Sequence, residues 1–383
     1  MAMWIDLPFD RLVKSGLCCC SQIALTHCSS FRLSIHTWPL IRKFHAHLSL
    51  SLSLSPSLSE QAYIVDDSLI LSGANLSEEY FVDRQDRYVL FENGGGGLVD
   101  FYADLIHTLR DDDSNEKINN GKRNGGTTTP GYYPHDLKDT VHNSDDSDAA
   151  VHIIPTFQSP HTANQPFVTK SGLTVPSDED VITTLLQTAL EESCTIRMAS
   201  AYLNPTPRIL DALGTNGYHS HTESTHSSPP VTFLTAAPDS HGFSPKPGVK
   251  RKGDWVPQAF TQICKDLSAS QYHRNLHQHS LLWYSRPSWT FHGKGIWIYS
   301  PDGHLVAATA GSGNYGYRSY RRDMESNVAL LFPQTQSTIQ TALDQEWEAL
   351  AQHSYVPDLQ KQSDDMEVPW QIRAILPILK HVL

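Results

Sequence analysis

The same short pattern occurs twice in this chain, and this internal repeat constrains the fold more than any other feature of the sequence. Each copy has a turn of small residues that ends in Asn, an acid eleven positions later, and then an apolar run. The first copy contains Asn75 and Asp86, and the second contains Asn314 and Glu325. A repeat of this kind predicts two similar structural units within one chain.

Strand and helix signals alternate around both copies, which predicts an α/β fold class. A hairpin with its turn at Asp66-Asp67 is expected over residues 62–71. Further strands are expected at 88–91, 195–202, 231–236, 281–284, 291–299 and 327–332. Helices are expected at 98–109, 178–192, 208–213 and 336–352.

Length and charge limit the classes of protein to consider. A chain of 383 residues is long enough for two domains or for one domain of two similar halves. The net charge of −12 argues against broad attraction to nucleic acid phosphates. No apolar stretch reaches the length of about 18 residues that a spanning helix needs. The six cysteines lack the spacing of metal ligands, so we expect neither a metal site nor a disulfide framework.

The chain divides by composition into five segments. Residues 1–61 are unlike the rest, 62–110 carry the first repeat, 111–170 read as an acidic disordered loop, 171–353 carry the second repeat, and 354–383 form an amphipathic C-terminal segment. The alternation of Leu and Ser over residues 48–55 is what a CT dinucleotide repeat encodes. We therefore favour retained intron sequence for residues 1–61, with a targeting segment as the alternative.

One histidine and one lysine of the second half form a candidate catalytic pair. His292 and Lys294 are two positions apart on an expected strand, so both side chains point to the same face. A neutral imidazole can attack phosphorus, while an ammonium and an Asn amide stabilise oxygens that gain negative charge. Glu325 is expected to accept a hydrogen bond from the far ring nitrogen of His292 and to fix its tautomer.

These residues resemble the phospholipase D superfamily, whose half-motif is His-x-Lys followed by Gly-Ser-x-Asn. Within that superfamily the chain is similar to the eukaryotic phosphatidylglycerophosphate synthases over residues 62–110 and 170–383. The strings that carry this similarity are Ser72-Gly73-Ala74-Asn75-Leu76-Ser77, Arg84-Gln85-Asp86-Arg87-Tyr88, Thr290-Phe291-His292-Gly293-Lys294-Gly295, Asn314-Tyr315-Gly316-Tyr317-Arg318-Ser319 and Arg322-Asp323-Met324-Glu325.

The resemblance implies a phospholipase D fold of two α/β halves, with mixed sheets flanked by helices and one site at a pseudo-twofold junction. It implies transfer of a phosphatidyl group from CDP-diacylglycerol to sn-glycerol 3-phosphate through a phospho-histidine, without metal or other cofactor. The expected catalytic residues are His292, Lys294 and Glu325, and the expected substrate-binding residues are Asn75, Asp86, Ser312 and Asn314. The implied location is the mitochondrion, peripheral to the inner membrane.

The C-terminal segment bears on that peripheral contact. Residues 369–381 mix apolar side chains with Arg, Lys and Trp, which is typical of a helix packed on the domain. Docking on a membrane is the alternative, because the implied substrate is a lipid.

The sequence departs from the family pattern in two places. Tyr299 stands where the superfamily has an aspartate, a departure that these synthases tend to share. By family spacing the first-half His and Lys belong at positions occupied by Ser59 and Gln61, and the opening of the first half is truncated. Two alternatives therefore stay open: a catalytically impaired or dead lipid-binding protein of this fold, and a phospholipase D-type nuclease.

Overall fold

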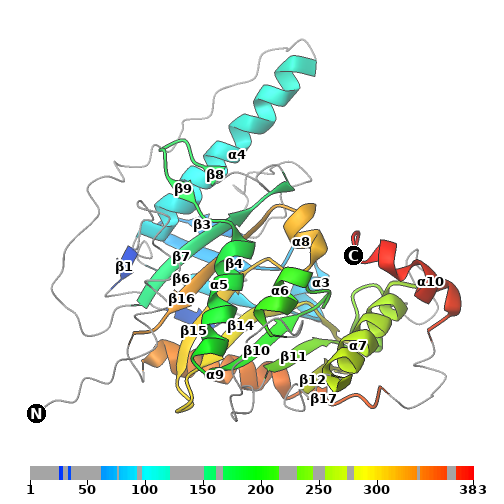
Figure 1. Ribbon diagram of the computed structural model, residues 1–383. Helices are drawn as coiled ribbons and strands as arrows, with labels where there is room; N and C mark the ends of the chain where they lie inside the picture. The colour runs from blue at the N-terminus through cyan, green and yellow to red at the C-terminus, as the bar shows by residue number, and fades with distance from the viewer. Residues whose placement is uncertain are drawn as a thin grey trace, which may run out of the picture.

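Two β-sheets form the framework of the chain (Figure 1). The structure, a computed structural model, describes residues 26–28, 33–35, 62–75, 77–92, 97–120, 151–160, 167–214, 231–244, 255–273, 280–333, 337–359 and 368–383. Within these residues the larger sheet has nine strands and the smaller has four, and two pairs of short strands lie outside both. The architecture is the mixed α/β class that the sequence predicts.

The large sheet runs in the order β1-β7-β16-β15-β14-β10-β11-β12-β17. Its strands are β1 (Thr26–Cys28), β7 (Val151–Gln158), β16 (Glu325–Leu331), β15 (Leu305–Gly311), β14 (Lys294–Tyr299), β10 (Thr195–Ser200), β11 (Val231–Ala236), β12 (Ser280–Tyr284) and β17 (Ser354–Tyr355). The central strands are covered on both faces, which explains why they read as continuous apolar runs. In β14, for example, Ile296 and Ile298 face one core cluster while Trp297 and Tyr299 face another.

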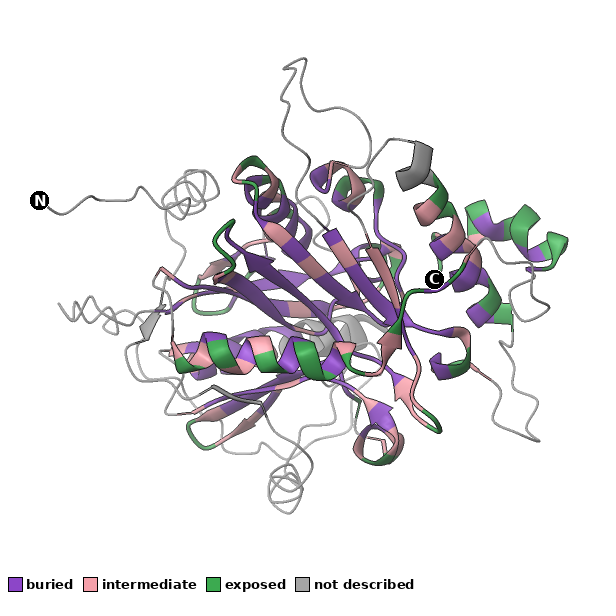
Figure 2. Cartoon of the chain, turned by 90° about the horizontal axis from the view of Figure 1, so that it is seen from below, coloured by how far each residue is buried: buried purple, intermediate pink, exposed green. Residues whose placement is uncertain are grey.

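Helices cover one face of the large sheet, and the small sheet with further helices covers the other (Figure 1). On the first face lie α5 (Asp178–Glu191) and α6 (Pro207–Ala212). On the second, α9 (Thr338–Ala351) buries Leu343, Trp347 and Leu350, which share one side of a helix. Figure 2 shows the strands buried along most of their length and the helices exposed on their outer sides.

The small sheet carries the first repeat. Its order is β2-β6-β4-β3, with β2 (Leu33–Ile35), β6 (Tyr88–Phe91), β4 (Ser68–Ser72) and β3 (Ala62–Val65). The β3–β4 hairpin turns at Asp66, whose φ of 51° lies in the left-handed region that Asp tolerates in turns. Helix α4 (Leu98–Asn120) follows, and β4 packs against β15, the strand that precedes the Asn turn of the second repeat. The two repeats therefore meet at these strands.

A short parallel pairing joins the halves next to the expected catalytic pair. Strand β5 (Arg84–Gln85) pairs with β13 (Thr290–Phe291), which places the acid of the first repeat beside the histidine of the second. The backbone N–H of His292 donates to the carbonyl of Gln85 at 2.7 Å. Helix α3 (Glu79–Val82) precedes β5 and lies close to it.

A buried arginine stabilises this contact between the two halves. The Arg87 guanidinium makes a bidentate pair with Glu346 of α9, with N···O distances of 2.9 and 2.7 Å. It also donates to the carbonyls of Lys294 and Thr309, and it lies 4.2 Å from the ring centroid of Trp297. Arg87 comes from the first half and all its partners come from the second, so this side chain ties the halves together.

Most expected elements are confirmed, but the expected disordered loop over 111–170 is wrong in part. Helix α4 continues to Asn120, and residues 151–158 form β7, which pairs with β16 inside the large sheet. A short apolar run is hidden when composition is averaged over a long polar segment. Short strands β8 (Phe167–Val168) and β9 (Thr174–Val175) follow. Residues 121–150 and 161–166 lie outside the described residues.

Two helices complete the fold beside β12 and β11. Helix α7 (Trp255–His273), which the sequence analysis missed, contains Pro257 in its first turn. Helix α10 (Trp370–Leu379) packs against α7 through Ile372 and Leu376, so the expected packing of the C-terminal segment on the domain is confirmed. In the described part of the chain, no helix is both long and apolar enough to cross a membrane.

We predict that Glu346→Ala lowers the free energy of unfolding by about 3–5 kcal/mol, because it leaves the buried Arg87 charge without its partner. Glu348→Ala on the same helix is the matched control. The Arg197–Glu348 pair is exposed, with side-chain exposures of 31% and 70%, so its loss costs less than about 1 kcal/mol. Urea unfolding of the three proteins tests this, and equal losses in the two variants would contradict it.

Candidate active site

The histidine and lysine of the second half lie where a strand is interrupted. His292 falls between β13 and β14, and Lys294 is the first residue of β14. The Lys294 ammonium donates to the carbonyl of His292 at 2.7 Å and lies 3.4 Å from Nε2 of the ring. The structure thus brings the two side chains to one point, as their spacing predicts.

The acid that orients His292 comes from the other half of the molecule. Nδ1 of His292 lies 2.8 Å from Oδ2 of Asp86, and the backbone N–H of Arg87 donates to Oδ1 of the same carboxylate. The expected bond between His292 and Glu325 is wrong, because the β5–β13 pairing brings Asp86 to the ring first. Asp86 does not line the pocket, so its expected role in binding substrate is also not supported by its position.

The surroundings of His292 keep its ring neutral. Burial, together with the nearby Lys294 charge, lowers the pKa of His292 to about 4. Burial alone would raise the pKa of the Asp86 carboxyl, but the Lys294 and His292 charges lower it overall. The neutral tautomer with its proton on Nδ1 donates to the Asp86 carboxylate and leaves the lone pair on Nε2. The Lys294 ammonium lies 2.5 Å from the same Nδ1. The Tyr80 hydroxyl lies 3.4 Å from Nε2.

A glycine gives Lys294 the room to reach this position. The ammonium lies 3.5 Å from the carbonyl of Gly73 and 3.8 Å from Oδ2 of Asp86. A Cβ at Gly73 would collide with the end of the Lys294 side chain, which explains the glycine at this position of the first Asn turn. Burial lowers the pKa of Lys294 to about 8, so the ammonium keeps its charge at neutral pH.

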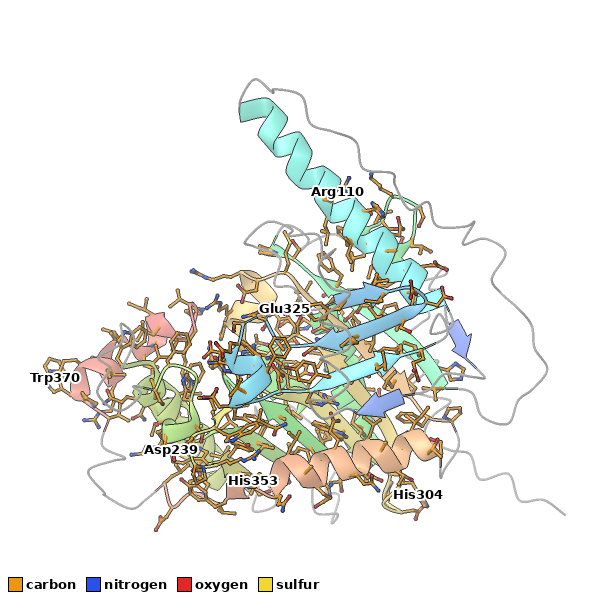
Figure 3. The ribbon with its side chains drawn as sticks, turned by 180° about the vertical axis from the view of Figure 1, so that it is seen from behind. Arg110, Asp239, His304, Glu325, His353 and Trp370 are labelled. Carbon is orange, nitrogen blue, oxygen red and sulfur yellow. The ribbon has the colours of Figure 1, made fainter. Side chains whose placement is uncertain are left out.

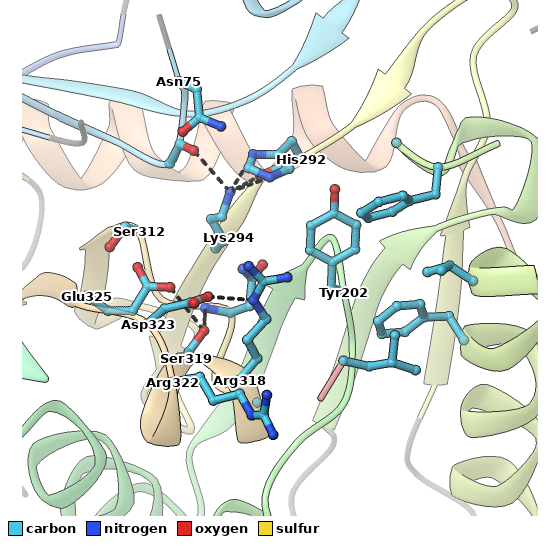
Figure 4. A pocket seen from close by; sticks show the side chains of 18 of the residues that line it. Asn75, Tyr202, His292, Lys294, Ser312, Arg318, Ser319, Arg322, Asp323 and Glu325 are labelled. Atoms are coloured by element: carbon cyan, nitrogen blue, oxygen red, sulfur yellow. Dashed lines mark hydrogen bonds and ion pairs between the residues drawn. The ribbon is translucent and has the colours of Figure 1, made fainter. Parts of the chain in front are cut away.

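Glu325 lies on the opposite side of Lys294 from His292 (Figure 4). Its Oε1 accepts a hydrogen bond from Ser319 at 3.2 Å, and Ser319 in turn accepts from the backbone N–H of Asn314. Burial raises the pKa of the Glu325 carboxyl to about 7, since the nearby Ser312 hydroxyl and Lys294 charge only partly offset it. The carboxyl therefore exchanges its proton near neutral pH.

These groups open into one pocket of about 750 Å³ that both halves line. Asn75, Asn314, His292 and Lys294 all border it, so the prediction that the two repeats share a cleft is confirmed. The Asn75 amide is 3.4 Å from the Tyr80 hydroxyl. Charged and aromatic residues complete the wall: Glu79, Arg84, Tyr202, Phe243, Trp255, Phe260, Arg318, Arg322 and Asp323.

Several of these wall residues have no role in the sequence analysis, although four of them, Arg84, Arg318, Arg322 and Asp323, stand in its family strings. The pocket lining holds four cations, Arg84, Lys294, Arg318 and Arg322, against three acids, Glu79, Asp323 and Glu325, in a protein of net charge −12. Tyr202 comes from the loop after β10 and packs edge-on against His292, with ring centroids 5.4 Å apart. Among the described residues, no three His, Cys, Asp or Glu side chains are grouped to hold a metal ion.

Sequence comparison gives a consistent set of relatives, although no profile of a known protein family matches the chain. The mitochondrial CDP-diacylglycerol–glycerol-3-phosphate 3-phosphatidyltransferase of Cricetulus griseus is 26% identical over 90% of this chain and 68% of its own length. The Homo sapiens protein of the same name is 27% identical over 90% of this chain and 67% of its own length. A probable enzyme of this name from Dictyostelium discoideum is 26% identical over 71% of this chain and 48% of its own length.

Among solved structures, phosphatidylserine synthase of Haemophilus influenzae superposes with a TM-score of 0.58 at 15% identity, covering 85% of this chain and 71% of that one. The chain thus has the phospholipase D fold that the sequence predicts, with a buried His-x-Lys pair opening into a cleft between its halves. Within that class its sequence is similar to the CDP-diacylglycerol–glycerol-3-phosphate 3-phosphatidyltransferases, at 26% and 27% identity over 90% of the chain for the two mammalian proteins. These relatives do not favour the nuclease or the lipid-binding alternative.

We predict that Glu325→Gln changes how stability depends on pH. Between its ordinary pKa of 4.5 and the folded value of about 7, Glu325 holds a proton that the unfolded chain has released. Stability therefore falls as pH rises through this window, and the variant lacks this loss. The variant should gain up to about 3 kcal/mol relative to the unaltered chain between pH 4.5 and pH 8.

Urea unfolding of the unaltered chain and of the Glu325→Gln variant at both pH values measures this difference. Both proteins keep His292. The depressed pKa of His292 acts in the opposite direction, and it cancels when the two proteins are compared at each pH. A difference between the proteins that is the same at pH 4.5 and pH 8 would show that Glu325 is ionised as freely in the folded chain as in the unfolded one.

Proposed function

We propose that this chain transfers a phosphatidyl group from CDP-diacylglycerol to sn-glycerol 3-phosphate, giving phosphatidylglycerophosphate and CMP. The observation that carries the proposal is the neutral His292, held by Asp86 and placed beside Lys294 at the wall of the pocket. The names of the relatives supply the two substrates. The same names place those relatives in mitochondria, and we extend this location to the chain.

In the first step, Nε2 of His292 attacks the phosphorus that carries diacylglycerol. An N–P bond forms, and the bond from this phosphorus to the bridging oxygen of the pyrophosphate breaks, so that CMP leaves with the electron pair. The Lys294 ammonium stabilises the oxygens that gain charge. Proton transfer from Nδ1 is unnecessary, because Asp86 holds the developing imidazolium as an ion pair.

In the second step, a hydroxyl of sn-glycerol 3-phosphate attacks the same phosphorus and the N–P bond breaks. The hydroxyl loses its proton, and the His292 ring is regenerated with its electron pair. Both steps need a group that gives a proton to CMP and later takes one from the acceptor. By the family resemblance this group is a first-half histidine at position 59, where this sequence has Ser59, outside the described residues.

We predict that the chain as written is a weak transferase, about 10²–10⁴-fold slower than the same chain with the family's first-half segment restored upstream of residue 62. Release of CMP from CDP-diacylglycerol in detergent micelles measures both rates. In the restored protein, His292→Ala should lower turnover by at least about 10³-fold. His304→Ala, on the turn between β14 and β15, is the control and should leave turnover unchanged. Full activity of the chain as written would overturn the assignment of the first half-site.

We also propose that α10 docks the protein on a membrane, the inner mitochondrial membrane in the cell. Its inner side packs on α7, whereas Trp370, Ile375 and Ile378 are exposed by 67%, 48% and 73%. Figure 3 shows Trp370 at the outer edge of the molecule. The chain end that follows α10 lines the pocket through Val382 and Leu383. A membrane under α10 would therefore present its lipid beside the pocket.

We predict that the double variant Trp370→Ser, Ile378→Ser binds vesicles containing anionic phospholipid at least about tenfold more weakly, because two exposed apolar side chains that would enter the bilayer interface are lost. Val356→Ser, which removes a side chain of 70% exposure next to β17, is the matched control. Cosedimentation with vesicles measures both. Equal binding by the double variant and the control would remove α10 from the docking surface.

A further inference from the structure

The pocket is lined by two chemically different groups of residues. The charged ones come mainly from α3, β5 and the segment around α8 (Tyr317–Arg321). The others come from the loop after β10, the segment after the short helix η5 (Pro238–Ser240), α7 and the chain end after α10. This second group, which we call the apolar lining, consists of Tyr202, Phe243, Trp255, Val256, Phe260, Val382 and Leu383. Figure 4 shows Tyr202 and Glu325 on opposite sides of Lys294. One pocket thus offers charge to one part of a ligand and an apolar surface to another.

The apolar lining begins beside the candidate nucleophile. The centroid of the Tyr202 ring is 5.4 Å from that of His292, 5.7 Å from that of Phe260 and 5.9 Å from that of Phe243. His241 packs against the same cluster, with its ring centroid 5.0 Å from that of Phe260. Burial lowers the pKa of His241 to about 3, so this ring is neutral. A ligand group bound beside these rings gains apolar contact and meets no charge from them.

The exposure of the apolar lining is graded. Val256 and Phe260 are 5% and 6% exposed, and they share a core cluster with the inner side of α10. Phe243, Trp255 and Val382 are 41%, 39% and 37% exposed. The apolar lining therefore continues from the buried site to the surface of the protein, next to the helix whose outer side carries exposed apolar residues.

We propose that the apolar lining is the subsite for the acyl chains of the lipid donor, which run past Tyr202 and leave the pocket beside α10. The proposal rests on the proposed function and adds where the lipid part of the donor lies. The reacting phosphorus is joined directly to diacylglycerol, so the chains begin close to Nε2 of His292 and meet the Tyr202 ring first. Chains that leave beside α10 enter the membrane on which this helix docks.

The cytosine base is the other flat group of the donor, but it fits the apolar lining less well. Its amino group, carbonyl and ring nitrogen need hydrogen-bond partners when they are removed from water. In the apolar lining, only the Tyr202 hydroxyl and the Trp255 indole N–H are polar side-chain groups. Amide side chains, those of Asn75 and Asn314, line the rest of the pocket. The lining therefore favours methylene groups over a base.

Binding of monomeric ligands to the full chain tests this subsite without a membrane. The probes are CDP-dihexanoylglycerol below its critical micelle concentration, CDP-glycerol, which has the same headgroup without acyl chains, and CMP, all measured by titration calorimetry. Each methylene removed from water adds about fourfold in affinity, so the unaltered chain should bind the lipid at least about 10²-fold more tightly than CDP-glycerol. Phe243→Ser and Trp255→Ser should each reduce this ratio by about tenfold and leave CDP-glycerol and CMP unchanged.

Two further variants separate loss of the subsite from general damage. Tyr355→Ser is the matched control for Phe243→Ser, because Tyr355 is an aromatic residue of similar exposure, 48% against 41%, and lies outside the pocket lining. This control should keep the full ratio. Phe243→Leu retains an apolar side chain at the same position, so it should keep most of the preference for the lipid.

Three results would overturn the subsite. The first is equal affinity of the unaltered chain for CDP-dihexanoylglycerol and CDP-glycerol. The second is a ratio that neither Phe243→Ser nor Trp255→Ser lowers, or that Tyr355→Ser lowers equally. The third is weaker binding of CMP and CDP-glycerol in these two variants with the ratio unchanged, which would assign the apolar lining to the base. In each case binding of CMP and CDP-glycerol to the unaltered chain leaves the proposed function standing, whereas a chain that binds none of the three probes contradicts both.

Discussion

The buried pair between Arg87 and Glu346 is the contact on which the rest of the site depends. It would be costly in isolation, because two charges are removed from water. It is stabilised by the four hydrogen bonds that the guanidinium donates, two of them to Glu346. The acceptors are the Glu346 carboxylate on α9, the carbonyl of Lys294, and the carbonyl of Thr309, which precedes the second Asn turn. Since Arg87 follows Asp86 directly, fixing its side chain also fixes the carboxylate that orients His292.

This linkage explains why the acid of the first repeat serves the histidine of the second half. Strand β5 pairs with β13, so the acid of the first repeat reaches the histidine of the second and Glu325 is left facing the opposite side of the pocket. A histidine that takes its acid from the other half in this way is correctly oriented only when the halves are docked. The catalytic site therefore depends on the packing of the two sheets, and neither half would hold a complete site alone.

Sequence reasoning reached the α/β class, the two repeats and most strands, because strands buried on both faces leave long apolar runs. It missed β7, whose eight residues follow a long acidic stretch that dominates the average composition. It also paired His292 with Glu325 in place of Asp86. The two acids have the same spacing from their Asn residues, so one-dimensional spacing cannot distinguish pairing within a repeat from pairing across repeats. The shared cleft could be predicted because the two Asn residues have the same spacing to their acids, and the strands that precede both Asn turns, β4 and β15, pack together.

Burial is the common cause of the unusual ionisation of the site. Removal from water disfavours charge on any group, so it lowers the pKa of His292 and Lys294 and raises that of Glu325. The three shifts suit one reaction: the imidazole is neutral and nucleophilic, the ammonium still charged at pH 7, and the carboxyl close to its midpoint. A substrate phosphate then meets positive charge from Lys294 and the wall arginines without full opposition from Glu325. The dry interior that makes His292 a nucleophile thus also limits the repulsion of its anionic substrates.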